Sequence, residues 1–209
     1  MRAQTLSPVA GWGWILTGFA IFRRNPITLG MLVLTYWFTV VFLNVLPYVG
    51  ALLASLVIPG LSVGLMQAAR QVERGLPIGV QTLFGSMKEN GRTLIALGAL
   101  YLACTLGILG LSTLLDGGDM FRFMMSSNRA ERAALEEADF ITPALFVMAL
   151  MTPVMMAYWF APVLAAWHRL TLGRALFFSF VACWMNWRAF LVYGAGLLLA
   201  AGVIPGVLL

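Results

Sequence analysis

Long uncharged stretches alternate with short charged segments along the chain. The first stretch, residues 25–69, carries no charged side chain. It is about twice the roughly 20 residues that one helix needs to cross the hydrocarbon core of a bilayer. Pro47 and Gly50 mark a turn in its middle, because both residue types interrupt helices. The pattern therefore predicts two membrane-spanning helices, near residues 27–46 and 50–69.

Three further uncharged stretches are each long enough to cross a bilayer once. They cover residues 93–115, 140–167 and 189–209. No stretch alternates as a strand would, and inside lipid a helix satisfies its backbone hydrogen-bonding groups within its own segment. The sequence thus predicts an all-α fold, a polytopic transmembrane helical bundle with five spans, in a single transmembrane domain over residues 1–209.

A short motif precedes the first, third and fifth predicted spans. In each copy a phenylalanine lies six residues before an asparagine, and an arginine lies close to the asparagine. Apolar residues at helical spacing around the motif predict interfacial amphipathic helices. Asparagine suits the corner at which such a helix turns into the membrane. The three copies are Phe19, Arg24 and Asn25; Phe84, Asn90 and Arg92; and Phe180, Asn186 and Arg188.

The motif predicts an internal repeat, in which an interfacial helix is followed by a hairpin of two spans. The repeats cover residues 11–69, 79–167 and 172–209, and a longer outer loop, 116–139, is inserted in the second. Within this loop, Asn128 to Glu131 resemble a capping box that opens a short helix, and a solvated connector is the alternative. The third repeat holds one span, so we expect a sixth helix from the repeat.

Composition excludes a soluble globular protein, because 61% of the residues are hydrophobic and only 10% are charged. The charges also differ between the two predicted sides. One side holds ten basic residues against two acidic ones, whereas the outer loop holds three basic residues against six acidic ones. Basic segments stay in the cytoplasm. This predicts a bacterial inner-membrane protein with a cytoplasmic N-terminus and a periplasmic loop 116–139.

The basic residues near the span ends predict contact with anionic lipid headgroups on the cytoplasmic side. The net charge of +5 is therefore assigned to membrane topology, and no nucleic-acid partner is expected. A protein partner or a homo-oligomer stays open. The residues expected to weaken lipid association when changed to glutamine are Arg23, Arg24, Arg174 and Arg188.

Groups that could carry chemistry do not converge in the predicted spans, since none of the five holds Asp, Glu, Lys or Arg. This argues against a proton relay, and we expect no enzymatic activity, no cofactor and no metal. His168, the single histidine, ends the fourth predicted span. It is expected to anchor the chain at the interface, and a catalytic role in an intramembrane enzyme is the alternative.

Pro59 and Pro153 occupy comparable positions in the first two predicted hairpins. Discontinuous helices at matching positions of repeats mark the central sites of some transporters. Proline kinks are also ordinary in membrane helices. We expect plain kinks, and a cavity for a small or lipidic solute near the two prolines is the alternative.

The opening, Gly11-Trp12 and then Phe22 to Pro26, and a C-terminal motif around Asn186 carry a resemblance to known proteins. They are similar to the N-terminal and C-terminal signatures of a family of uncharacterised six-helix proteobacterial inner-membrane proteins. The family in turn resembles the membrane domain attached to some glycerophosphoryl diester phosphodiesterases. The resemblance implies a fold and a location but no reaction or ligand. Its C-terminal motif comprises residues 156–162, His168, Ala175, Ser179-Phe180, Ala182-Cys183, Asn186-Trp187 and residues 190–194.

The leading hypothesis is a non-catalytic membrane protein that acts through its surfaces, as an accessory subunit, a scaffold or a lipid-organising element. A transporter or channel for a small or lipidic solute is the rival.

Overall fold

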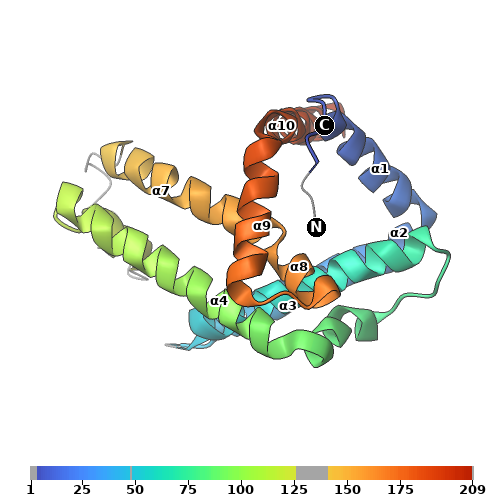
Figure 1. The fold of residues 1–209 in the computed structure, drawn as a ribbon, viewed down its shortest axis with the longest axis horizontal. Coiled ribbons are helices and arrows are strands. Elements are labelled where there is room, and N and C mark those ends of the chain that lie inside the picture. The colour runs from blue at the N-terminus through green and yellow to red at the C-terminus, as the bar shows by residue number, and fades with distance from the viewer. Residues whose placement is uncertain (1–3, 48, 126–140, 209) are drawn as a thin grey trace.

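The computed structural model describes residues 4–47, 49–125 and 141–208, and every element within these ranges is a helix (Figure 1). This confirms the predicted all-α fold. Most of the outer loop, including the capping box predicted at Asn128 to Glu131, lies outside the described residues. The helices are α1 (Ala10–Arg24), α2 (Pro26–Val45), α3 (Gly50–Glu73), α4 (Val80–Asp116), α5 (Asp119–Met125), α7 (Ile141–Trp159), α8 (Ala161–His168), α9 (Leu172–Met185) and α10 (Trp187–Leu208).

Four segments of the described chain are long and apolar enough to cross a membrane as helices. They are Pro26–Val45, Gly50–Glu73, Asn90–Asp116 and Ile141–His168. Leu172–Met185 and Trp187–Gly202 pass the same criterion only together, and they are bent by 78° relative to each other. The polytopic architecture is therefore confirmed, with four spans or up to five if the bent pair crosses as one.

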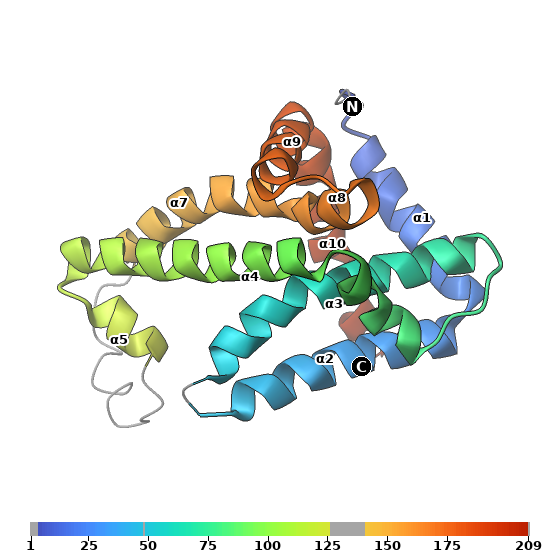
Figure 2. The ribbon, with the colours of Figure 1, turned by 60° about the horizontal axis from the view of Figure 1, so that its bottom comes forward.

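The four segments run between two ends of the bundle (Figure 2). One end carries the turn between α2 and α3 and the connection from α4 to α5. The opposite end carries the junction of α1 with α2 and the connection from α3 to α4. We call this opposite end the basic end, and it comprises residues 20–26, 66–92 and 160–174.

Helices α3 and α4 approach each other closely at two glycines. A Cβ atom at Gly64 would overlap the carbonyl oxygen of Leu83, and one at Gly98 would overlap the carbonyl oxygen of Ser55. Small residues let membrane helices pack backbone to backbone. As a result, α3 packs against both the first and the second part of α4. The fully buried leucines around this contact are Leu61, Leu83, Leu94 and Leu97.

Helix α1 packs against α10, although about 160 residues separate them in the chain (Figure 1). A Cβ atom at Gly11 would overlap the carbonyl oxygen of Ala189. The ring of Trp14 lies edge-on to that of Phe190, with 5.3 Å between centroids. One part of the apolar surface of α1 is therefore covered by protein, whereas Phe19 is 60% exposed.

Candidate functional site: the basic end

The backbone leaves helical geometry at each asparagine of the sequence motif. Asn25 separates α1 from α2, and its side-chain oxygen accepts a hydrogen bond from the N–H of Thr28 at 3.4 Å. Asn90 interrupts α4 with φ −143° and ψ 37°. Asn186 separates α9 from α10 at the 78° bend. At each of these three corners the chain changes direction between two helices, and basic residues lie next to the corner.

Asn90 joins its corner to the end of the fourth span. Its amide nitrogen donates to the carbonyl oxygen of Ala165 in α8 at 2.6 Å. Its amide oxygen accepts from the hydroxyl of Thr93 at 3.0 Å. The break in α4 is thereby held against α8, which brings two segments of the basic end together.

Asn186 joins its corner to the N-terminal segment. Its amide oxygen accepts from the N–H of Leu6 at 2.7 Å, and its amide nitrogen donates to the carbonyl oxygens of Gln4 and Ala182, both at 2.9 Å. The residue is only 8% exposed. Because a buried amide needs partners for all its polar groups, this position favours asparagine over an apolar residue.

The fourth span breaks at Phe160, where Ser179 of α9 inserts its hydroxyl. The hydroxyl accepts from the N–H of Phe160 at 2.9 Å and donates to the carbonyl oxygen of Met156 at 2.9 Å. These are the two groups that would bond each other in a continuous helix. A side chain inserted into this ladder is a known cause of helix kinks.

Pro59 and Pro153 do not mark a shared discontinuity. Each lies inside a helix, α3 or α7, that continues past it. Pro59 is buried and Pro153 is exposed. Neither lines any of the three pockets described below. The alternative of discontinuous helices at these prolines is therefore wrong, because the break in the fourth span occurs at Phe160.

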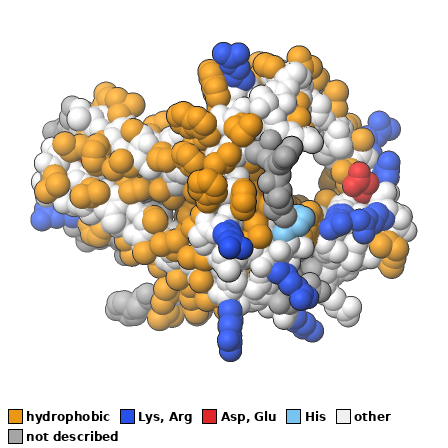
Figure 3. Space-filling model, viewed as in Figure 1, with side chains coloured by type: hydrophobic (Ala, Val, Ile, Leu, Met, Phe, Trp, Pro, Cys, Tyr) orange, Lys and Arg blue, Asp and Glu red, His pale blue; other side chains and the backbone are white. Residues whose placement is uncertain are grey.

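A hollow of about 600 Å³ opens at the basic end between α1, α3 and α8. Figure 3 shows basic side chains around an opening on this face of the molecule, with an acidic group on its border. Four of the lining residues belong to one face of α3, and one comes from α1. The lining residues are Ile21, Met66, Ala69, Arg70, Glu73, Trp167 and His168.

Arg70 and Arg24, the two arginines at the hollow, contact an aromatic ring and a backbone carbonyl rather than an acidic side chain. The guanidinium carbon of Arg70 lies 4.8 Å from the ring centroid of Trp167, a cation–π contact. Nη1 of Arg24 donates to the carbonyl oxygen of Glu73 at 3.0 Å. In the described part of the chain, neither Arg70 nor Glu73 forms an ion pair, although both line the same space.

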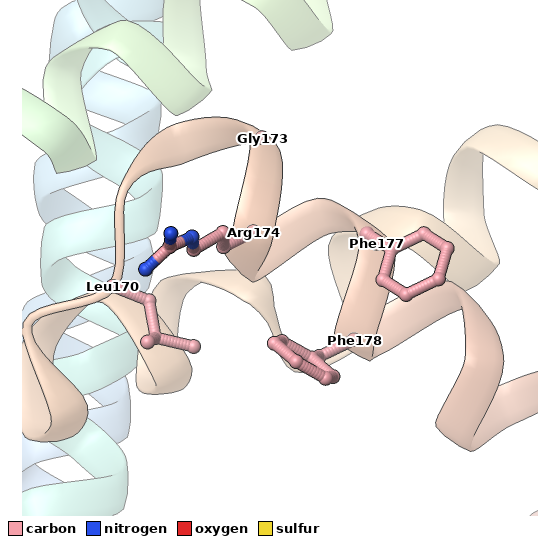
Figure 4. A pocket seen from close by; sticks show the side chains of 5 residues that line it. All are labelled: Leu170, Gly173, Arg174, Phe177 and Phe178. Atoms are coloured by element: carbon pink, nitrogen blue, oxygen red, sulfur yellow. The ribbon is translucent and has the colours of Figure 1, made fainter. Parts of the chain in front are cut away.

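Two smaller pockets are also present in the described part of the chain. One, of about 350 Å³, lies on α9, where Arg174 is directed toward Leu170 beside Phe177 and Phe178 (Figure 4). The other, of about 230 Å³, lies between α3, α4 and α8, and Gln67, Gln71 and Thr82 give it a polar lining. Both contain too few converging titratable groups for acid–base chemistry. Among the described residues, no group of three His, Cys, Asp or Glu side chains could hold a metal ion.

The structure brings two of the sequence-predicted residues, Arg24 and His168, to the hollow. The other basic candidates stay apart and lie against aromatic rings or in the open. The guanidinium carbon of Arg23 lies 6.0 Å from the ring centroid of Phe19, and that of Arg188 lies 5.4 Å from the ring centroid of Trp187. The remaining candidates are Phe84 and Arg92, which are exposed, and Phe180, which stacks on Trp184.

Arg70, Glu73 and Trp167 were not predicted as site residues. Met66, Ala69, Arg70 and Glu73 follow the spacing of one helix face, which is the signal that could have grouped them. The sequence could not show that α1 and α8 cover this face, since that depends on contacts between distant segments.

Comparison with known proteins supports the membrane assignment. No family model and no solved structure matches the chain, and nothing supports the expected relationship to glycerophosphoryl diester phosphodiesterases. A probable inner membrane protein of Burkholderia thailandensis is 37% identical over 200 residues, which cover 93% of this chain and 74% of the relative. The chain is therefore an integral membrane protein that belongs to the same family as this probable inner membrane protein.

Proposed function

We propose that the protein is a non-catalytic, lipid-organising element of the bacterial inner membrane, whose basic end and corners bind anionic lipid headgroups at the cytoplasmic surface. The observation that carries this proposal is a set of exposed bases that form no ion pair with any described residue. They are Arg23, Arg24, Arg74, Lys88, Arg92, Arg169, Arg174 and Arg188.

Anionic lipid headgroups can supply the counter-charge for these bases. Each Lys or Arg near an anionic membrane surface contributes on the order of 1 kcal/mol to attraction. The aromatic neighbours fit the same location, because Trp187 and Phe19 lie under Arg188 and Arg23, and aromatic belts form at the headgroup level. The relative's name is that of a probable inner membrane protein, which supports the location.

Replacing Arg23, Arg174 and Arg188 together by glutamine tests the proposal. Arg24 is kept, because it bonds the backbone of Glu73. We expect the purified variant to retain at least about tenfold less phosphatidylglycerol than the wild type, measured by native mass spectrometry, because three attractions of this size are lost. Arg122→Gln, at the opposite end in α5, is the control and should retain the wild-type amount. Equal retention by the triple variant would contradict the proposal.

A second candidate function is transport of a small solute, and the polar pocket at Gln67, Gln71 and Thr82 favours it. The hydroxyl of Thr82 lies 3.3 Å from Oε1 of Gln71, so the pocket presents hydrogen-bonding groups inside an apolar bundle. Counterflow of labelled solutes in proteoliposomes tests this function. Flux that Gln67→Leu abolishes would favour transport over the proposal above.

A further inference from the structure

We infer that the hollow between α1, α3 and α8 binds a phospholipid with a zwitterionic phosphoethanolamine headgroup, with its phosphate at Arg70 and its ammonium at Glu73. This inference rests on the proposed function, because it requires the basic end to lie among lipid headgroups. It adds a specific site to what is otherwise a diffuse basic surface.

The hollow presents one positive and one negative group that do not neutralise each other. Arg70 and Glu73 both line it, and neither forms an ion pair within the described residues. A ligand that carries both charges can satisfy both groups, since a guanidinium forms strong hydrogen bonds with phosphate and a carboxylate forms them with a primary ammonium. A headgroup of a single sign would leave one of the two side chains facing a like charge.

The guanidinium of Arg70 is positioned before any ligand arrives. Its guanidinium carbon lies 4.8 Å from the ring centroid of Trp167, and its N–H groups donate to no acceptor among the described residues. The planar fork of arginine matches the oxygens of a phosphate. Arg24, whose Nη1 donates to the carbonyl oxygen of Glu73 at 3.0 Å, adds a second positive charge at the border of the hollow.

The end of α3 that carries Glu73 favours a cation. Helix α3 ends at Glu73 and helix α8 ends at His168, so two helix C-termini meet here. The C-terminus of a helix carries partial negative charge. Together with the Glu73 carboxylate, this partial charge would repel a purely anionic headgroup and attract an ammonium, whose hydrogen bonds the carboxylate accepts.

The apolar part of the lining identifies a lipid rather than a soluble phosphate compound. Met66 and Ala69 lie on the same face of α3 as Arg70 and Glu73, about one turn deeper into the bundle, and Ile21 faces them from α1. This order, from apolar to charged toward the helix end, matches the order from glycerol and acyl chain to headgroup in a phospholipid. A soluble phosphoethanolamine compound would leave these side chains uncovered.

The first measurement is native mass spectrometry of the full chain in detergent, titrated with phosphatidylethanolamine and phosphatidylcholine that have the same acyl chains. Both lipids are zwitterionic, so the basic corners do not distinguish them, but only the ethanolamine headgroup has N–H donors for Glu73. We expect at least about tenfold tighter binding of phosphatidylethanolamine. Equal binding of the two lipids would overturn the inference.

Two variants separate the roles of the charged groups. Glu73→Gln should abolish the preference for phosphatidylethanolamine, whereas Arg70→Gln should weaken both lipids by about tenfold and keep their ratio, because both share the phosphate. Arg122→Gln and Asp119→Asn, both in α5 at the opposite end, are the matched controls, since neither residue lines the hollow, and both should behave as the wild type. A preference that survives Glu73→Gln would overturn the assignment.

A soluble competitor tests whether the ligand is a lipid. Glycerophosphoethanolamine at a tenfold excess should not displace the bound phosphatidylethanolamine, and displacement would show that the apolar lining contributes nothing. The corner variant of Arg23, Arg174 and Arg188 keeps the hollow intact. If this variant loses phosphatidylglycerol but still prefers phosphatidylethanolamine to phosphatidylcholine, both proposals are supported. If it loses phosphatidylglycerol and shows no such preference, the proposed function stands and the specific site is removed.

Discussion

The hydroxyl of Ser179 lies between two backbone groups that would bond each other in a continuous helix. The side chain is fully buried, so water is not a ready substitute. This single residue therefore fixes both the break between α7 and α8 and the place where α9 contacts it.

We expect Ser179→Ala to lower the free energy of unfolding by about 1–3 kcal/mol, because the N–H of Phe160 and the carbonyl of Met156 lose their partner. Ser112→Ala is the matched control. Ser112 is also fully buried, but its hydroxyl donates only to the carbonyl of Leu109 in its own helix. Unfolding in mixed detergent titrated with SDS measures both variants. Equal losses would show that Ser179 acts merely as a small buried residue.

Asn186 is the corner residue whose replacement should have the largest effect. Its side chain makes three hydrogen bonds, two of them to the N-terminal segment at Gln4 and Leu6. We expect Asn186→Ala to speed the hydrogen exchange of the Leu6 amide by at least about tenfold, since that amide loses its acceptor. Asn25→Ala, which removes one local bond to Thr28, should leave the exchange of Leu6 unchanged. An unchanged rate in both variants would contradict this role for Asn186.

At the residue scale, the sequence indicated the three corners but not the hollow. Asn25, Asn90 and Asn186 could be singled out because asparagine has a local preference for turns and caps. Arg70 and Trp167 could not be singled out, because they are 97 positions apart in the chain and each, taken alone, has the character of an ordinary interfacial residue. A sequence indicates local chemistry, whereas it does not indicate a contact between distant helices.

At the scale of the elements, the contact of α3 with α4 depends on glycine. We expect Gly64→Ala to destabilise the protein by about 1–3 kcal/mol, because the new methyl group would overlap the backbone of Leu83 and force the helices apart. Gly107→Ala in α4 is the control, since no atom lies within 4 Å of a Cβ there, and it should be neutral or stabilising by up to about 1 kcal/mol. SDS titration followed by circular dichroism distinguishes the two. Similar stabilities would contradict the close packing.

The uncharged stretches predicted the long helices well. The predicted spans 27–46 and 50–69 correspond to α2 and to most of α3. The structure departs from expectation where one helix acts on another, as at Phe160, where the partner is a serine from α9 rather than the nearby Pro153. Periodicity in one segment contains no information about an insertion from another segment.

At the scale of the whole molecule, the two ends differ in charge, and this difference predicts the orientation. In a background with Cys104→Ala and Cys183→Ala, Arg122→Cys in α5 should react with a membrane-impermeant maleimide in intact spheroplasts. Leu76→Cys, exposed between α3 and α4, should react only after the membrane is opened. The reverse labelling pattern would place the basic end outside the cytoplasm.

The class of the molecule, a polytopic helical membrane protein, could be predicted from its sequence, because the bilayer itself determines the charge distribution and the lengths of the uncharged stretches. The helices against which each helix packs could not be predicted. The contact of α1 with α10 arises from Gly11 and Gly196, two of 21 glycines that composition alone cannot tell apart.

The pairing of α1 with α10 has a consequence for biosynthesis. Gly11 and its neighbour Ala189 lie about 180 positions apart, so the ribosome needs on the order of 10 to 40 s to supply the second partner after the first. During that interval the face of α1 that packs on α10 has no docking partner and must rest on lipid or on the insertion machinery. The timing of bundle closure is therefore set by the rate of translation, and slowing the ribosome before α10 should prolong the exposure of Trp12 and Ile15 on the nascent chain.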